Sequence, residues 1–259
     1  MMDTFTFAAG TVPLLVSIPH DGRQLPCEIA GQMTAAGRAI RDTDWHVARL
    51  YDFASDLGAS IIRAEYSRYV VDLNRSPDDE ILYKGHFETG LCTSQAFSGD
   101  EIYKHGTAVD IEERVREFWQ PYHDKLDETL REMRDQHGYA LLWDAHSVGS
   151  RVPSLFDGEL PELNFGTWDD RSCNPVLSAR VVAAAEASPY SVVVYGRFKG
   201  GYITRHYGRP GEGIHAMQLE LAQRTYMDEE SFEYRDANAL RLRDTLRGLL
   251  ETFLAAASL

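Results

Sequence analysis

The sequence predicts an α/β protein, with residues 1–259 forming a single-domain three-layer α/β/α arrangement on a mixed sheet. Two observations predict this fold class: short apolar, β-branched runs alternate with segments of helical periodicity, and no repeat or linker divides the 259 residues. A chain of this length can bury a full hydrophobic core. Binding sites in such sheets gather at the carboxyl ends of the strands, so polar residues at those ends are the candidates for function.

Six apolar or β-branched runs predict strands, at residues 12–18, 60–63, 69–73, 139–145, 190–195 and 214–221. Four segments with apolar residues three and four apart predict helices, at residues 42–57, 109–136, 175–187 and 237–256. We expect Asp42 to be the N-cap of the first helix and Gly58 to end it, and Pro121 to kink or restart the second. Residues 76–106 and 147–174 are polar and irregular, and a loop as long as the first usually covers a site.

The composition narrows the classes of partner. The formal net charge is −14, from 26 basic and 40 acidic residues, which argues against binding to nucleic acids or to anionic membrane surfaces. No run approaches the roughly 18 apolar residues of a membrane span, and the N-terminus lacks a secretory signal pattern. The cysteines are odd in number and far apart, which is typical of free thiols in a reducing cytoplasm: Cys27, Cys92 and Cys173.

Two histidines lie just beyond predicted strands and suit a metal. His20 follows the first strand and His146 follows another, and catalytic zinc takes three protein ligands plus water. Either histidine alone would more often be an ordinary surface residue, but the pair favours a metal. The third ligand would be a carboxylate, and Asp44 is our choice. Asp42 has a strong competing role as an N-cap, and Asp144 is an alternative that could instead hold the neighbouring histidine.

Further polar residues break apolar patterns. Glu220 points off the apolar strand 214–221, which is unfavourable unless it has a partner or a task such as general base, although a strand with one solvated face explains the pattern equally well. The strand 69–73 runs into Asn74-Arg75, and the planar fork of arginine matches a carboxylate. The loop 197–209 holds four Arg or Lys and no acid, which indicates an anionic ligand. Nucleotide-binding glycine motifs and a serine-hydrolase elbow are absent from the sequence.

These residues lie in fragments that resemble the N-formylglutamate amidohydrolase family, from Pro13 to about Glu230. Six fragments in order carry the resemblance: SIPHDGR at 17–23, DTDWHV at 42–47, SRYVVDLNRSPDD at 67–79, DAHS at 144–147, RFKGGYITRHYGRPGEG at 197–213 and HAMQLELAQRTYMDE at 215–229. The family is in turn similar to zinc carboxypeptidases and to the succinylglutamate desuccinylase and aspartoacylase group. The resemblance therefore implies a fold like that of the zinc carboxypeptidases and of the phosphorylase/hydrolase type.

The resemblance also implies roles for individual residues. It matches the metal-binding histidines to His20 and His146, the carboxylate-binding pair to Asn74-Arg75, and the late-strand Glu to Glu220. The carboxypeptidase pattern has a Glu three residues after the first histidine, where this chain has Arg23. The carboxylate ligand must therefore come from elsewhere, and Asp44 is an inference rather than a matched position.

The activity that the resemblance implies is metal-dependent hydrolysis of N-formyl-L-glutamate to formate and L-glutamate in histidine degradation. The metal, Zn²⁺ in the first instance, would be held by His20, Asp44 and His146, and it would make hydroxide available near neutral pH. Glu220 would take the proton of the water and pass it to the departing amine.

The substrate carries two carboxylates, so two cationic sites are expected. Arg75 with Asn74 should take one, and Arg205 of the loop 197–209 should take the other, with Arg63 and Arg68 as reserves. Two alternatives remain open at this stage. A related metallohydrolase could act on another N-acyl amino acid or small peptide, and a non-catalytic module could bind carboxylates without a metal.

Overall fold

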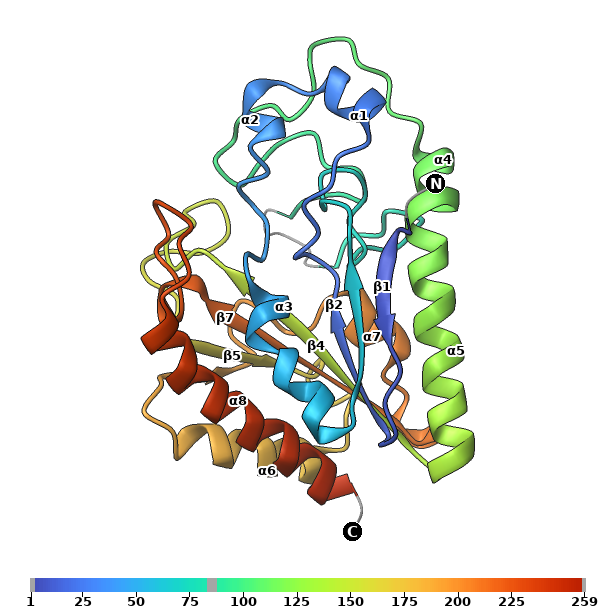
Figure 1. Ribbon diagram of the computed structural model, residues 1–259, viewed down its shortest axis with the longest axis vertical. Helices are drawn as coiled ribbons and strands as arrows, with labels where there is room; N and C mark the ends of the chain where they lie inside the picture. The colour runs from blue at the N-terminus through green and yellow to red at the C-terminus, as the bar shows by residue number, and fades with distance from the viewer. Residues whose placement is uncertain (1–2, 83–87, 258–259) are drawn as a thin grey trace.

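The computed structural model describes residues 3–82 and 88–257. A mixed sheet runs through these residues, with the strand order β1-β3-β2-β4-β7-β5-β6 (Figure 1). Its strands are β1 Phe5–Ala8, β2 Leu14–Ile18, β3 Ser60–Ala64, β4 Ala140–Val148, β5 Leu163–Gly166, β6 Val192–Val194 and β7 Ile214–Ala222. The central strands β3, β2, β4 and β7 are parallel. β1 runs antiparallel to β3 and β5 antiparallel to β7, while β6 is parallel to β5. The predicted fold class, α/β with a mixed sheet, is confirmed.

Helices cover both faces of the sheet (Figure 1). One face packs against α3 Val47–Leu50, a 3₁₀ turn Asp52–Leu57, α6 Pro175–Glu186 and α8 Asp236–Ala257. The other face packs against α5 Gln120–His137 and α7 Tyr202–Tyr207. Each face has its own apolar core, because successive side chains of β4 alternate: Trp143 belongs to the first core and Leu142 to the second. Three short helices lie nearer the sheet edge that carries the site: α1 Cys27–Gln32, α2 Ala35–Arg38 and α4 Ile111–Arg114.

The segment 42–57 differs from the single helix predicted for it. Positive φ angles at Ile40 (44°) and His46 (65°) bend the chain, so that α3 starts only at Val47. Asp42 is not the N-cap. The N-cap position is His46, which makes no side-chain capping hydrogen bond; Asp21, from outside the helix, accepts one from the main-chain N–H of Ala48 through Oδ2 at 2.9 Å.

The prediction of a strand at 69–73 is wrong. This stretch forms turns, and the carbonyls of Tyr69, Val70 and Leu73 accept hydrogen bonds from side chains rather than from a neighbouring strand; Arg114, for example, donates to the carbonyl of Val70 at 2.9 Å. The stretch 147–174 was predicted to be irregular, but it contains the strand β5. The sequence of this short strand shows no clear apolar pattern. The loop 76–106 is irregular as predicted where it is described; its residues 83–87 lie outside the described residues.

The helix predicted for 109–136 is interrupted. After α4 comes a π-helical turn, Val115–Trp119, and α5 then begins with Pro121 in its first turn, so the predicted restart at this proline is confirmed. The three cysteines are free thiols, as predicted. Among the helices of residues 3–82 and 88–257, none combines the length and the apolar character that a bilayer crossing requires.

Candidate metal centre and its cavity

The parallel strands β2, β4 and β7 bring three polar residues to one edge of the sheet. His20 lies two residues beyond β2, while His146 and Glu220 lie near the carboxyl ends of the paired strands β4 and β7. The register pairs His146 directly with Glu220, so both side chains point to the same face. The sheet itself therefore sets the relative placement of these residues.

Asp44 joins the two histidines to form a buried cluster. Its Oδ2 lies 3.1 Å from His146 Nδ1 and 3.7 Å from His20 Nδ1. Two main-chain contacts fix this placement, because the N–H of Asp44 donates to the carbonyl of His20 at 3.0 Å and the N–H of Ser147 donates to Asp44 Oδ2 at 3.0 Å. One ligand atom from each of the three residues lies within 4.8 Å of the others, which is a spacing that a metal ion could bridge.

The far nitrogen of each imidazole faces a second carboxylate. His20 Nε2 lies 2.7 Å from Asp72 Oδ1, and His146 Nε2 lies 3.1 Å from Asp144 Oδ1. For His20, a proton on Nε2 satisfies Asp72 and leaves the lone pair of Nδ1 facing Asp44, as in metal sites where a carboxylate orients a histidine ligand. For His146, the hydrogen-bond partner of Nε2 is the amide of Asn74, and Asp144 Oδ1 has no hydrogen-bond partner among the described residues. Of the three carboxylates considered from the sequence, Asp44 lies with both histidines and Asp144 lies behind one. Asp42 instead accepts a hydrogen bond from the N–H of Phe97 at 2.8 Å.

The buried charges favour a cation. Burial alone would raise the pKa of Asp44, but its interactions with the imidazoles of His146 and His20 hold it well below its usual range. The pKa of Asp72 is likewise depressed against the effect of burial, chiefly by Arg68, which lies 2.6 Å away. With Asp144 fully buried nearby, the cluster concentrates negative charge that water cannot solvate. Two imidazoles and a carboxylate are also a common donor set of catalytic zinc, so the residues present fit such an ion.

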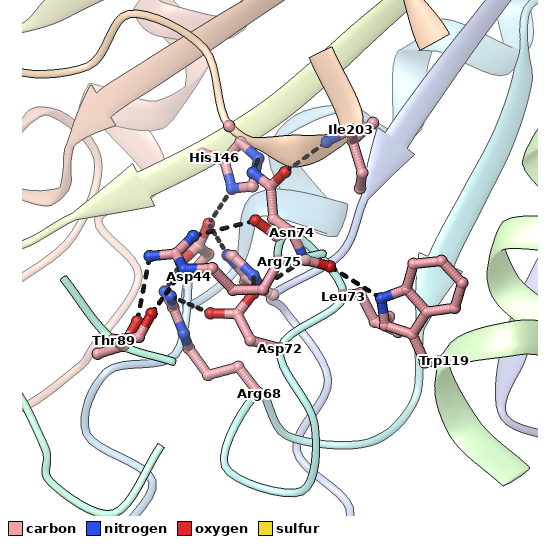
Figure 2. A network of polar contacts seen from close by, with 12 residues as sticks. Asp44, Arg68, Asp72, Leu73, Asn74, Arg75, Thr89, Trp119, His146 and Ile203 are labelled. Carbon is pink, nitrogen blue, oxygen red and sulfur yellow. Dashed lines mark hydrogen bonds and ion pairs between the residues drawn. The ribbon is translucent and has the colours of Figure 1, made fainter. Parts of the chain in front are cut away.

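A cavity opens over the cluster. Its lining includes His20, His146, Glu220 and three arginines, Arg68, Arg75 and Arg197. Arg75 is held by neutral acceptors: Nε donates to the carbonyl of Thr89 at 2.7 Å, and Nη2 donates to the Thr89 hydroxyl at 3.2 Å (Figure 2). Within the described part of the chain Arg75 forms no ion pair, so its charge is available to an anionic ligand.

Asn74 is locked beside the cluster. Its Oδ1 accepts a hydrogen bond from the N–H of Ile203 at 2.8 Å, and this fixes the amide so that Nδ2 points to His146 Nε2 at 3.0 Å (Figure 2). Gly201 makes the arrangement possible, because a Cβ atom at that position would overlap the Asn74 side chain. The predicted Asn74-Arg75 pair thus lies at the cavity, although not on a strand.

Glu220 presents a buried carboxyl group to the cavity. Its side chain is 7% exposed, and among the described residues no hydrogen bond to its carboxylate is found. Burial raises the pKa of Glu220 to about 8, which is close enough to neutrality for proton transfer in either direction.

The other arginines singled out from the sequence lie differently. Arg205 donates to the carbonyls of Gly200 and Leu82, at 2.7 and 3.1 Å, and is not among the residues that line the cavity. Arg197, from the same loop, lines it instead, with its Nε bonded to the carbonyl of Leu155 at 2.7 Å.

Of the two reserves, Arg63 pairs with Glu65, and Arg68 lines the cavity while paired with Asp72. Asp72 itself was missed, although an acid within the apolar run 69–73 was a signal for it.

An α/β sheet with a buried His–Asp–His cluster under an arginine-lined cavity defines a class of protein with a candidate metal centre for a small anionic ligand. A model of the family described as N-formylglutamate amidohydrolase matches residues 12–227. The chain belongs to the N-formylglutamate amidohydrolase family.

Relatives cover almost the whole chain. It is 50% identical over 260 residues to an N-formylglutamate deformylase of Pseudomonas putida and 52% identical over 260 residues to one of Pseudomonas aeruginosa, with 98% of this chain and 97% of the relative covered in both cases. A crystal structure of N-formylglutamate amidohydrolase from Ralstonia eutropha JMP134 superposes with a TM-score of 0.83 at 25% identity, covering 98% of this chain and 97% of that one. A protein from Agrobacterium tumefaciens shares the fold, with a TM-score of 0.72 at 18% identity and 96% of each chain covered.

Proposed function

We propose that this protein hydrolyses N-formyl-L-glutamate to formate and L-glutamate. The observation that carries the proposal is the buried cluster of His20, Asp44 and His146 at the floor of a cavity that also holds Arg75 and Arg197. Such a site combines a place for a metal with positive charge for a substrate that has two carboxylates. The names of the two Pseudomonas relatives, each about half identical to this chain, support the choice of substrate.

The cluster would hold a divalent metal, with zinc as the first candidate. Such an ion, when bound, supplies Lewis-acid chemistry: it lowers the pKa of water toward about 7 and polarises a carbonyl group. Asp72 would hold the imidazole of His20 in the orientation that turns its Nδ1 to the ion, while Asn74 and Asp144 lie on the Nε2 side of His146.

Glu220 would act as the general base and then as the general acid. It takes one proton from the attacking water as the new C–O bond forms at the formyl carbon. It then delivers this proton to the nitrogen as the C–N bond breaks, so that formate and the free amine of glutamate leave. The pKa that burial gives Glu220, about 8, suits a group that must accept and release one proton per turnover.

Two arginines would recognise the two carboxylates of the substrate. Arg75, with the amide of Asn74, would bind one of them. Arg197 would bind the other, in place of Arg205, because Arg197 lines the cavity. A guanidinium group left without its carboxylate in a desolvated site is unfavourable, which would make both substrate charges matter for binding.

Formate release from a small panel of substrates tests the proposal. N-formylglutamate should be the best substrate. N-formylglutamine leaves one arginine unpaired, at about 1.5–3 kcal/mol, or roughly 10- to 150-fold in kcat/KM. N-acetylglutamate adds a methyl group, and overpacking a tight pocket costs about 1–3 kcal/mol.

Chelation tests the metal in the same assay. Dialysis against a chelator should abolish formate release, and Zn²⁺ or Co²⁺ should restore it. Full activity without metal would contradict the metal proposal, and preference for N-acetylglutamate would indicate a different deacylase.

A further inference from the structure

Two side chains, Trp119 at the end of the π-helical turn and His123 in α5, hold the main chain on either side of Asn74. Trp119 Nε1 donates to the carbonyl of Arg75 at 3.0 Å, and His123 Nε2 lies 2.8 Å from the carbonyl of Leu73. A carbonyl can only accept, so Nε2 of His123 carries the proton. Figure 2 shows Trp119 on the side of this segment that faces away from His146.

The two donors support each other. The rings of Trp119 and His123 are stacked, with centroids 3.7 Å apart and an interplanar angle of 18°. His123 Nδ1 lies 2.9 Å from the hydroxyl of Tyr207 in α7, the helix whose residue Ile203 binds Asn74 Oδ1. Both aromatic side chains are buried, at 5% and 3% exposure. The segment is therefore clamped between α5 and α7 by groups that have little freedom to move.

The π-helical turn Val115–Trp119 sets the register of this clamp. Arg114, which binds the carbonyl of Val70, precedes Trp119 by five residues. In a regular α-helix, residues five apart lie about 140° apart around the axis, so both could not face the same segment. A π turn closes i→i+5 hydrogen bonds and brings residues five apart onto one face. His123 follows Trp119 by four residues in the direction of α5, and this normal α-helical spacing places both side chains on one face.

We propose that Trp119 and His123 are positioning residues, which hold the main chain around Asn74 so that Asn74 and Arg75 are aimed at the cavity. The inference rests on the proposed function, in which this pair binds a substrate carboxylate. Neither aromatic side chain touches the metal cluster, and Trp119 donates only to a main-chain carbonyl. Their effect should therefore appear in substrate binding more than in the chemical step or in metal content.

Trp119→Phe removes the N–H and keeps an aromatic ring for stacking. The loss of one hydrogen bond should raise KM for N-formylglutamate about 3- to 10-fold, with kcat changed less than about twofold and metal content unchanged. Trp143→Phe is the matched control, because Trp143 also donates a buried hydrogen bond, to the Tyr51 hydroxyl at 3.0 Å, but in the core on the other face of the sheet. It should lower stability and leave KM unchanged.

A second pair of variants tests His123. Gln can place an N–H close to the position of Nε2, whereas Leu cannot donate. His123→Gln should therefore keep KM closer to the wild-type value than His123→Leu does. A double-mutant cycle with Arg75→Lys then asks whether Trp119 acts through Arg75, in which case Trp119→Phe adds little to the KM of the Arg75→Lys enzyme.

Hydrogen exchange of the peptide 69–76 provides a readout that does not depend on activity. Exchange should be faster in Trp119→Phe and His123→Leu and unchanged in Trp143→Phe. Wild-type exchange in the first two variants, or a KM no higher than that of Trp143→Phe in an active enzyme, would overturn the inference. If the wild-type protein released no formate from N-formylglutamate, the proposed function would fail, and the exchange data would still decide whether Trp119 and His123 hold this segment.

Discussion

His20 Nε2 lies 2.7 Å from Asp72 Oδ1, and this contact turns the opposite nitrogen of the ring toward Asp44. Asp72 is itself fixed from two sides, by Arg68 at 2.6 Å and by the main-chain N–H of Asn74 at 2.9 Å. The segment that is proposed to bind substrate therefore also sets the orientation of a proposed metal ligand. The main-chain segment from Asp72 to Arg75 therefore contributes both to the proposed metal site and to the proposed substrate site.

Asp72→Asn should weaken metal binding about 10- to 100-fold, because the histidine loses the charged acceptor that orients it. Competition with a chelator of known affinity measures the change. Asp56→Asn is the control, since Asp56 is exposed and, within the described part of the chain, forms an ion pair with Arg247 on the surface. Equal metal affinity of the two variants would show that Asp72 is not needed for the ligand geometry.

Substitutions at three aspartates should rank in a fixed order. Asp44→Asn removes the charge that lies with both histidines and should reduce metal stoichiometry most. Asp144→Asn should act more weakly, because Asp144 faces the far side of His146. Asp42→Asn should leave metal content unchanged, since its carboxylate accepts a hydrogen bond from the N–H of Phe97 and is not part of the cluster of His20, Asp44 and His146. Metal analysis of the three purified proteins gives the ranking, and a larger loss with Asp42→Asn would move the ligand there.

Glu220→Gln should lower kcat about 10²- to 10⁴-fold while metal content and KM survive, since the amide keeps the shape and cannot accept the proton. The pH profile provides a second test. A general base acts when deprotonated, so the rate should rise with pH through its pKa, which burial raises to about 8 and which a bound cation lowers. Glu220→Gln should remove this rising limb. An unchanged profile would show that another group titrates.

Arginine-to-lysine changes should separate binding from non-binding arginines. Arg75→Lys and Arg197→Lys keep the charge but lose the planar fork, so each should raise KM for N-formylglutamate sharply. Arg205→Lys should have a smaller effect, because Arg205 binds main-chain carbonyls and does not line the cavity. Steady-state kinetics on the three variants decides the assignment, and a dominant effect of Arg205→Lys would restore the original expectation for that residue.

His123 should make the protein less stable in acid. Burial lowers the pKa of His123 to about 3, while in the unfolded chain it is about 6.5. Below pH 6.5 His123 binds a proton in the unfolded state but not in the folded state, so the free energy of unfolding decreases as the pH falls toward 3. The loss approaches about 1.4 kcal/mol per pH unit within this window. The free energy of unfolding of wild type relative to His123→Gln should fall with this slope, and a constant difference from pH 7 to pH 4 would contradict it.

Much of the fold follows from apolar periodicity. The strand 12–18 and the helix 237–256 were recognised because every side chain of β2 is buried and because α8 carries a continuous apolar stripe, with Leu242, Leu246 and Phe253 buried. The two histidines were recognised for a related reason, since each lies at the end of a buried strand or just beyond it. Patterns of this kind are local, and a local pattern is what a sequence displays.

The remaining features depend on contacts between distant segments. The run Tyr69–Leu73 has the composition of a strand, but the carbonyls of Val70 and Leu73 bind side chains more than 40 residues away. Asp42 is of a residue type that commonly caps helices, but Asp21, from another part of the chain, accepts the hydrogen bond from the first turn of the helix. The choice between Arg197 and Arg205 depends on how the loop 197–209 folds over the sheet. Spacing along the chain does not reveal any of these contacts.

The register between β4 and β7 has a consequence for how this site can change over evolution. His146 and Glu220 are paired across one hydrogen-bonded ladder, yet 73 residues separate them in the chain. Insertions or deletions in the connection between the two strands leave their spacing untouched, whereas a slip of one residue in either strand turns its side chain to the opposite face. The connecting loops, which include Arg197, can therefore diverge toward new acyl groups or new anions. His146 and Glu220 do not tolerate such changes. The substrate specificity can therefore change in this fold while the catalysed reaction stays the same.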